Sequence, residues 1–370
     1  MAQDLFKTAL SSLKECSRYR ALSLPSGVDL TSNDYLGMAV HPVLRKDAIQ
    51  ALDGGMDIGA AGSRLLRGHT DSHAQLEEFA AAHFNAGKTL YFSSGFQANY
   101  ALLTTLPQRG DIVLYDALVH ASMREGLSAA NAKSFKFAHN DLQALEDALK
   151  KHGQNAKTLW IAIESVYSMD GDIAPLNEIY ALVQAYDAHI IIDEAHGTGV
   201  FGEGGRGYAW DLIKAHGYAQ ITTLHTCGKA VGVAGGLVCG SSDVIDYLIN
   251  KARPFIYSTA PMPLQAFLVE KSLAILASEE GDIRRAKLRS LCDKACDLFG
   301  GSGTQVVPII LGSDEKALGV ARALQDRGYD IRAIRPPTVP EGTSRLRLSL
   351  SSELSQDILQ GFADALKEIT

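Results

Sequence analysis

The 370-residue sequence has no long apolar run, few cysteines and no excess of positive charge. Its apolar runs are far shorter than the roughly 18 residues that a membrane-spanning helix needs, which excludes that class. The formal net charge of -7 argues against nucleic-acid binding as a main function, because such proteins present basic surfaces. The chain also lacks repeats and low-complexity tracts. Its 46% hydrophobic content therefore predicts a globular protein with an ample core.

Cysteine is scarce and its number is odd. Cys292 and Cys296 are one helical turn apart, but no histidine or second cysteine pair accompanies them. We therefore expect ordinary helix residues there, and no metal site. The odd count and the lack of an apolar signal segment before Cys16 predict a cytoplasmic location. The complete set is Cys16, Cys227, Cys239, Cys292 and Cys296.

Apolar residues recur at helical spacing close to the N-terminus, which predicts a short amphipathic helix ahead of Cys16. We expect the apolar side of this helix to pack on the body of the protein. The residues concerned are Leu5, Phe6, Ala9, Leu10 and Leu13.

Short apolar runs alternate with helical patterns through the middle of the chain. Ser72 and Asn140 each precede an amphipathic stretch and have a glutamine three residues later, which predicts two helix starts. Such alternation is typical of an α/β fold with a mostly parallel sheet covered by helices on both faces. The runs expected to form strands are Thr89–Phe92, Ile112–Tyr115, Leu159–Ile163, Ile190–Asp193, Ile221–Leu224 and Gly236–Cys239.

The pattern changes after about Pro263, where a long helical stretch leads into a smaller region. Val306–Leu311 is strand-like, and the segment 345–350 alternates between polar and apolar residues. A period of two predicts a half-buried antiparallel strand, and hence a small α+β domain. We predict an N-terminal arm over residues 1–38, a large α/β domain over 39–262 and the α+β domain over 263–370.

A carboxylate, an imidazole and an amine follow two of the predicted strands, in an order that suits a binding site for a cofactor. Asp193 ends an apolar run, so it lies at the carboxyl edge of a strand, where open α/β sheets bind ligands. His196 comes three residues later, and Lys229 follows the next run. A lysine amine can hold pyridoxal phosphate as a Schiff base, and a carboxylate can keep the pyridine nitrogen protonated. Taken singly, Lys229 would be a solvated lysine and Asp193 a turn former.

Three further segments fit a pyridoxal phosphate site. The turn at Ser94 and Gly95 opens a helix, whose free N–H groups and positive dipole end suit a phosphate. His120 suits stacking on the pyridine ring, although a polar residue at a helix start would look the same. Ser168 follows another strand and would place its hydroxyl beside the ring. The glycine-rich segment 197–207 is either a flexible loop near the cofactor or an irregular connection.

Together these motifs resemble those of the α-oxoamine synthase family of fold-type I pyridoxal phosphate enzymes. The resemblance extends from about Asn33 almost to the C-terminus. It implies that family's fold and a homodimer with shared active sites. The segments are SNDYLG (32–37), GSRLLRG (62–68), SSGFQAN (93–99), HAS (120–122), YSMDGD (167–172), DEAHGTGVFGEGGRG (193–207), TCGK (226–229), YST (257–259) and RPPTVPEGTSRLRLSL (335–350).

The resemblance assigns roles around the cofactor. It makes Lys229 the Schiff-base lysine and the general base. Asp193 becomes the partner of the ring nitrogen, His120 the stacking group and His196 the contact to the ring hydroxyl. Ser258 and Thr259 would reach the phosphate of the neighbouring subunit. The full set of implied cofactor contacts is Gly95, Phe96, His120, Ser168, Asp193, His196, Thr226, Lys229, Ser258 and Thr259.

The resemblance also implies substrate contacts, which are Arg20, Asn33, His120, Thr338 and Arg347. Arg347 is expected to hold the amino-acid carboxylate bidentately. Arg345 has the same parity in its strand and would face the same side. For the acyl substrate both Arg18 and Arg20 are candidates, and we choose Arg20.

The segment 335–350 most resembles the branch that condenses L-alanine with a pimeloyl thioester in biotin biosynthesis, an acyltransferase reaction that releases carbon dioxide and a free thiol. The alternative is a glycine C-acyltransferase of the same family. A non-catalytic pyridoxal phosphate-binding protein is the third possibility, and the intact set of Asp193, His196 and Lys229 argues against it. The acyl carrier, coenzyme A or acyl carrier protein, stays open.

Overall fold

The computed structural model describes residues 2–370, which form two compact units. The first, which we call the C-terminal unit, contains the chain up to Asn33 together with Met169–Asp172 and Lys287–Thr370. The second, which we call the sheet unit, contains Asp34–Ser168 and Ile173–Ala286. The predicted domain boundaries after residues 38 and 262 remain a prediction.

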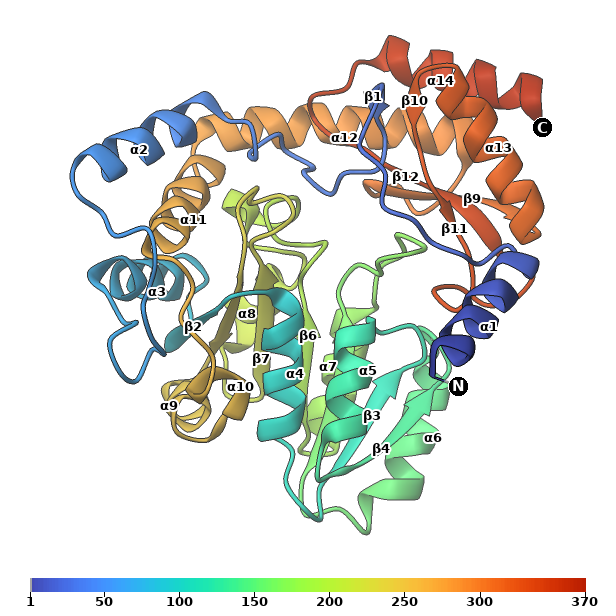
Figure 1. Ribbon diagram of the computed structural model, residues 1–370. Coiled ribbons are helices and arrows are strands. Elements are labelled where there is room, and N and C mark those ends of the chain that lie inside the picture. The colour runs from blue at the N-terminus through green and yellow to red at the C-terminus, as the bar shows by residue number, and fades with distance from the viewer. Residues whose placement is uncertain (1) are drawn as a thin grey trace. The chain divides into compact units, whose positions relative to one another are not determined.

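A seven-stranded sheet forms the centre of the sheet unit (Figure 1). All its neighbouring strands run parallel except β8, which is antiparallel to both neighbours. The mostly parallel sheet and all six predicted strands are therefore confirmed. β4 was not predicted, because Lys133 and Lys136 interrupt its apolar pattern. The spatial order is β2 (Lys88–Phe92), β8 (Gly236–Gly240), β7 (Ile221–Thr226), β6 (His189–Asp193), β5 (Leu159–Glu164), β3 (Ile112–Asp116) and β4 (Lys133–Phe137).

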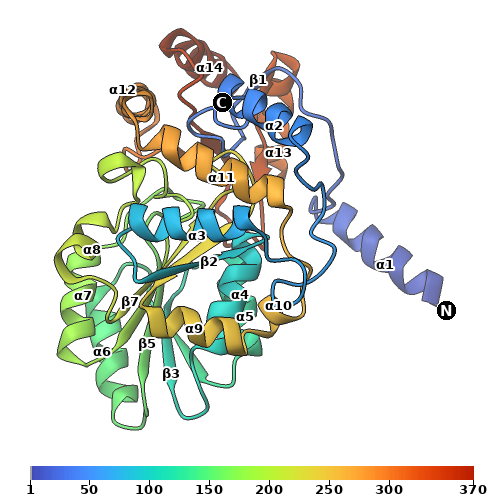
Figure 2. The same cartoon turned by 90° about the vertical axis from the view of Figure 1, so that its left-hand side faces the viewer.

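Helices cover this sheet, and Figure 2 shows α3 and α9 on opposite sides of β2. The predicted helix starts were close but displaced. α3 follows the cap residue Thr70, two residues before Ser72, and α6 follows Asp141, one residue after Asn140. The helices of this unit are α2 (Pro42–Asp53), α3 (Asp71–His83), α4 (Gly95–Thr105), α5 (Ala121–Ala129), α6 (Leu142–Gly153), α7 (Leu176–Ala185), α8 (Trp210–His216), α9 (Ser242–Lys251), α10 (Arg253–Ile256) and α11 (Pro263–Leu276).

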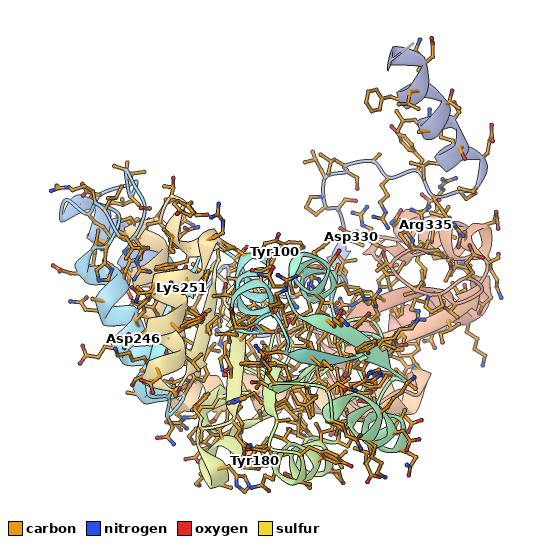
Figure 3. The ribbon with its side chains drawn as sticks, turned by 90° about the horizontal axis from the view of Figure 1, so that it is seen from below. Tyr100, Tyr180, Asp246, Lys251, Asp330 and Arg335 are labelled. Carbon is orange, nitrogen blue, oxygen red and sulfur yellow. The ribbon has the colours of Figure 1, made fainter. Side chains whose placement is uncertain are left out.

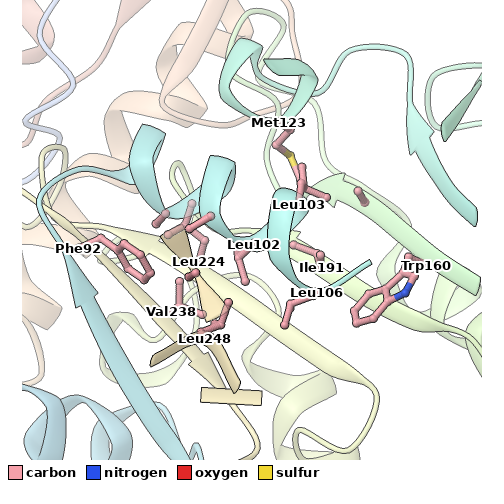
Figure 4. Packing of buried hydrophobic residues seen from close by; sticks show 14 of the residues in the cluster. Phe92, Leu102, Leu103, Leu106, Met123, Trp160, Ile191, Leu224, Val238 and Leu248 are labelled. Atoms are coloured by element: carbon pink, nitrogen blue, oxygen red, sulfur yellow. The ribbon is translucent and has the colours of Figure 1, made fainter. Parts of the chain in front are cut away.

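The apolar core fixes α4 against the strands (Figure 4). Leu102 and Leu103 of α4 are fully buried, as are Ile191 of β6 and Val238 of β8. Burying each such side chain contributes about 1.5–3 kcal/mol. This packing holds the N-terminus of α4, at Gly95, in a defined place on the sheet.

The C-terminal unit contains small sheets and helices, which confirms the α+β prediction. A three-stranded antiparallel sheet has the order β11, β12, β9, and β1 pairs with β10 in parallel. α12 carries the chain into this unit from the sheet unit. The elements are α1 (Ala2–Glu15), β1 (Val28–Asp29), α12 (Glu279–Phe299), β9 (Val306–Gly312), α13 (Asp314–Asp326), β10 (Tyr329–Asp330), β11 (Ala333–Ile334), β12 (Ser344–Ser349) and α14 (Gln356–Ile369).

Two expectations for this unit were wrong. All six residues of β12 are buried, so the strand is not half-buried. Its arginines tolerate burial because polar groups meet them, as when Arg345 pairs with Asp170. The N-terminal helix does form, but Leu5 and Phe6 are 68% and 67% exposed, so its apolar side is not packed on the body. An amphipathic pattern specifies a helix without specifying what covers its apolar side.

Among the helices that the structure describes, none combines the length and the apolar character needed to cross a bilayer.

Candidate active site

Two acidic residues end neighbouring strands of the sheet unit. Asp193 ends β6 and Glu164 ends β5, and the two are paired in the parallel register. Asp193 is 3% exposed. Its Oδ1 accepts a hydrogen bond from the backbone N–H of Ala195 at 2.9 Å, and its Oδ2 accepts one from Nδ2 of Asn99 at 2.6 Å. These bonds hold a carboxylate at the carboxyl edge of the sheet, as the sequence predicted.

Lys229 lies against a histidine that the sequence also singled out. Its Nζ is 2.6 Å from Nε2 of His196. The other ring nitrogen, Nδ1, is 2.7 Å from the hydroxyl of Tyr35, which is fully buried. Because both ring nitrogens have partners, the imidazole plane is fixed beside the amine.

Six of the predicted residues line one cavity, which holds about 120 Å³. That volume is close to the roughly 150 Å³ known to admit a benzene-sized ring. The lining also includes Asn99, Ser122 and Glu164, which the sequence did not single out. The six predicted members are Gly95, Phe96, His120, Asp193, Thr226 and Lys229.

The first turn of α4 forms one wall of this cavity. Ser94 caps the helix by accepting a hydrogen bond from the N–H of Gln97. The N–H groups of Gly95 and Phe96, which begin the helix, have no acceptor within it. A Cβ atom on Gly95 would lie 3.0 Å from Oγ1 of Thr226. The glycine therefore keeps this wall open to backbone contact.

A hydrogen-bonded chain links His120 to Asp193. Nδ1 of His120 is 2.8 Å from the hydroxyl of Ser122. Nδ2 of Asn99 lies 2.9 Å from that hydroxyl and 2.6 Å from Asp193. Burial lowers the pKa of His120, which favours a neutral ring. His120 lines the cavity, and the faces of a neutral imidazole are apolar enough for stacking.

Glu164 is the site residue that sequence reasoning missed. Its side chain is 1% exposed, and within residues 2–370 its Oε1 has no hydrogen-bond partner. Burial, reinforced by the charge of Asp193, raises the pKa of Glu164 well above its usual range, although hydrogen bonds from the backbone of His120 and Ser168 oppose the shift. The sequence signal was available, since Glu164 ends an apolar strand as Asp193 does. Glu164 lines the cavity, so a ligand there is one candidate partner for this oxygen.

The remaining cofactor candidates lie outside this cavity lining. Oγ of Ser258 accepts a hydrogen bond from Nε2 of Gln97 at 2.9 Å. Thr259 forms an isolated bridge with Ser63. Ser168 is buried and reaches Glu164 through its backbone.

The substrate candidates of the C-terminal unit form two pairs. Nη2 of Arg20 donates to Oγ1 of Thr338 at 3.1 Å. Nη1 of Arg347 donates to Oδ1 of Asn33 at 3.0 Å, and also to the hydroxyl of Ser349 at 2.7 Å.

The two alternative arginines of this unit are already paired with carboxylates. Arg345 pairs with Asp170, and Arg18 pairs with Asp314 and Glu341. Arg347 contacts the neutral oxygens of Asn33 and Ser349, and Arg20 contacts that of Thr338.

Comparison with known proteins identifies the family. The model of the aminotransferase class I and II family matches residues 25–366. The chain belongs to this family. A curated relative, the 8-amino-7-oxononanoate synthase of Chromobacterium violaceum, is 44% identical over 90% of this chain and 86% of its own length. This relationship confirms the resemblance to the α-oxoamine synthases.

Solved structures agree with the family assignment. A serine palmitoyltransferase from S. paucimobilis, solved with a PLP–myriocin aldimine, is 26% identical, with a TM-score of 0.88 over 99% of this chain and 96% of that one. An 8-amino-7-oxononanoate synthase from Francisella tularensis is 27% identical, with a TM-score of 0.76 over 93% and 97%. The predicted fold-type I architecture is therefore confirmed.

Proposed function

We propose that this protein is a pyridoxal phosphate enzyme that condenses L-alanine with a pimeloyl thioester. The products are 8-amino-7-oxononanoate, carbon dioxide and a free thiol, within biotin biosynthesis. The observation that carries the proposal is the single cavity lined by Lys229, Asp193 and His120, in a chain 44% identical to a curated synthase of that product. The glycine C-acyltransferase alternative has no comparable support.

The residues of the cavity fit the cofactor. When bound, pyridoxal phosphate supplies an electron sink that stabilises negative charge at the α-carbon of an amino acid. Lys229 would hold it covalently, Asp193 would face its ring nitrogen, and His120 would cover its ring. The N–H groups of Gly95 and Phe96 would receive the phosphate. The unpaired Oε1 of Glu164, which lines the same cavity, supports the presence of a further polar ligand.

Lys229 would move the proton of the proposed reaction. Its Nζ would remove hydrogen from the α-carbon of L-alanine and return one after decarboxylation. Nε2 of His196, at 2.6 Å, can accept a hydrogen bond from Nζ when the ring carries its hydrogen on Nδ1. The oxygen of Tyr35 is then placed to accept the Nδ1 hydrogen. This arrangement would aim the lysine lone pair at the substrate.

Residues of the C-terminal unit would bind the substrates. Arg347 would hold the carboxylate of L-alanine, because a guanidinium group can bind a carboxylate through two parallel hydrogen bonds. Arg20 and Thr338 would contact the acyl chain. We also propose a homodimer to which Ser258 and Thr259 contribute across the interface. A cytoplasmic location is proposed from the cysteines, which are all free.

A spectral titration tests this function. The purified protein with bound cofactor would be titrated with L-alanine, glycine and L-serine, and pimeloyl-CoA would then be added. We expect the visible absorbance to shift at the lowest concentration with L-alanine, and carbon dioxide to appear only after the thioester is added. A preference for glycine, together with indifference to the pimeloyl donor, would contradict the proposal and indicate a sister activity.

A further inference from the structure

A second cavity, of about 500 Å³, lies within the C-terminal unit. Its walls come from the segment after α1, from α13 and from the chain around β11, and they include Tyr19, Arg20, Arg322, Arg332 and Arg335. Among the described residues that line it there is no aspartate or glutamate. We call it the arginine pocket; Figure 3 labels Arg335 and the neighbouring Asp330. Four arginines in one hollow stand out in a chain with a net charge of -7.

The positive charge of this pocket is mostly uncompensated. Nη2 of Arg332 lies 2.8 Å from the carboxylate of Asp330, which is buried. Within residues 2–370, Arg20, Arg322 and Arg335 form no ion pair. Arg335 donates to the carbonyl oxygen of Ser17, which leaves its charge in place. The pocket therefore carries about three net positive charges.

The contrast with Arg18 shows that these arginines are not placed to hold the arm by ion pairs. Arg18 precedes the pocket and is neutralised by Asp314 and Glu341. The pKa of Asp314 is lowered by its hydrogen bonds from Ser344 and Arg18, with a further contribution from the charge of Arg335. Apart from Arg332, which pairs with Asp330, the arginines that line the hollow form no ion pair within residues 2–370.

Several guanidinium groups around one hollow suit a ligand with several negative charges. Guanidinium groups bind phosphate oxygens bidentately and lose less hydration than ammonium groups. Tyr19 lines the same pocket and is 42% exposed; Nζ of Lys14 lies over its ring, 5.0 Å from the centroid, so a base would contact the exposed part that remains. The volume lies within the roughly 300–1,000 Å³ typical of small-ligand sites. These features describe a site for a phosphorylated nucleotide.

We propose that the arginine pocket binds the phosphorylated nucleotide of a coenzyme A thioester, with Arg322, Arg332 and Arg335 holding its phosphates. The inference rests on the proposed function, which requires an acyl thioester. Arg20, the residue chosen for the acyl substrate, lines this same pocket and contacts Thr338. An acyl carrier protein is a different partner, because its acidic surface would dock on a broad basic face. A hollow of about 500 Å³ has the size of a small-ligand site, which favours the small carrier.

The test shortens the exposed side chain of Arg322, so that the substitution leaves no cavity in the protein core. Arg322 is exposed on α13 and its side chain forms no ion pair or hydrogen bond within the described residues, so Arg322→Ala removes a charge without breaking either. Arg327→Ala is the matched control, because Arg327 follows the same helix, pairs with Glu368 and lies outside the pocket. Both variants would be titrated, as holoenzymes, with adenosine 3′,5′-diphosphate by calorimetry. Kinetics would then compare pimeloyl-CoA with pimeloyl-pantetheine, which lacks the phosphates.

We expect Arg322→Ala to weaken nucleotide binding about tenfold, as the loss of one charge-assisted hydrogen bond does. The KM for pimeloyl-CoA should rise by a similar factor, while the values for pimeloyl-pantetheine and L-alanine stay unchanged. Arg327→Ala should behave as the parent protein. Added salt should weaken nucleotide binding to the parent protein more than to Arg322→Ala.

Two outcomes would overturn the inference. One is nucleotide binding that is absent, or that is equal in both variants and the parent. The other is a KM that rises only for pimeloyl-acyl carrier protein, which would identify an acidic protein as the partner. The protein could also bind the nucleotide through Arg322 and yet condense no pimeloyl thioester with L-alanine. That result would support the nucleotide site and contradict the proposed function.

Discussion

The cofactor cavity and the arginine pocket handle charge in opposite ways. In the cavity the charges of Asp193 and Lys229 lie close to neutralising or hydrogen-bonding partners and away from water. In the arginine pocket the charges are partly exposed and share one sign. Burial makes each charge costly unless it is paired, so the cavity acts through fixed geometry and shifted pKa values. An open pocket acts through its net field, which salt weakens.

The largest effect is expected at the amine of the buried cavity. Lys229→Ala should lower turnover by at least about 10³-fold, because it removes both the covalent attachment and the proton acceptor. The visible absorbance of the lysine-bound cofactor should also disappear. Turnover and absorbance would be measured on the same preparation, with thermal unfolding to check the fold. A Lys229→Ala protein with parental turnover would remove the basis of the proposed mechanism.

The paired acids at the ends of β5 and β6 offer a sharper comparison. Asp193→Asn should lower kcat by about 10²-fold, since the amide cannot supply the negative charge. Glu164→Gln should cost less than about threefold, because burial raises the pKa of Glu164 and favours its neutral form, which the amide resembles. Infrared spectroscopy should detect a protonated carboxyl band in the parent that Glu164→Gln lacks. Equal losses in the two variants would mean that Glu164 is ionised.

The buried side chain of His83 should add to the acid sensitivity of the sheet unit. Burial lowers the pKa of His83 to about 4, helped by the charges of Arg206 and Arg285. The unfolded chain takes up a proton near pH 6.5 and the folded chain only near pH 4, so stability is lost as the pH falls through this window. His83→Phe should therefore reduce the loss of unfolding free energy between pH 7 and pH 5 by about 2 kcal/mol.

Urea unfolding at pH 7 and pH 5 would measure this effect. Within the described residues, Nε2 of His83 has no hydrogen-bond partner that the substitution would break. His216→Gln is the control, because His216 is exposed at the end of α8. An unchanged pH dependence in His83→Phe would show that other groups govern acid unfolding.

The smallest effect is expected for the arginines of β12. Arg347→Ala should raise the KM for L-alanine about tenfold, the loss expected for one charge-assisted hydrogen bond. Arg345→Ala should leave that KM unchanged and lower the thermal midpoint instead, because it strands the carboxylate of Asp170. Steady-state kinetics and thermal unfolding on both variants would separate the two. Reversed effects would assign the carboxylate contact to Arg345.

Local patterns sufficed for most of the sheet unit. Each predicted strand was an apolar run. Such runs can be recognised in a sequence because both faces of a covered parallel sheet are buried. β4 escaped because Lys133 and Lys136 break its run. The helix cap at Thr70 was missed because the residue three positions later is His73. The pattern used for the prediction requires a glutamine or glutamate there, as follows Ser72.

The site was predictable where a motif carries its own chemistry. Asp193, His120 and Lys229 were found because each follows a strand in the order the chemistry requires, and the structure brings them into one cavity. Asn99 was not, because its importance depends on its contact with Asp193, 94 residues away in the chain; Glu164 carried the same strand-end signal as Asp193 and was overlooked. The burial of β12 likewise depends on Asp170, which lies 175 residues away from Arg345 in the chain. No local pattern reveals such partners.

The lysines of β4 have a consequence for solubility. β4 is an edge strand, since β3 is its only neighbour in the sheet that the structure describes. Such an edge leaves one row of backbone groups ready to pair with a strand of another molecule. Lys133 and Lys136 are exposed there. If the β4 edges of two molecules approached each other, these lysines would repel. The two lysines that interrupt the apolar pattern of β4, and so prevented its prediction, thus also oppose edge-to-edge aggregation.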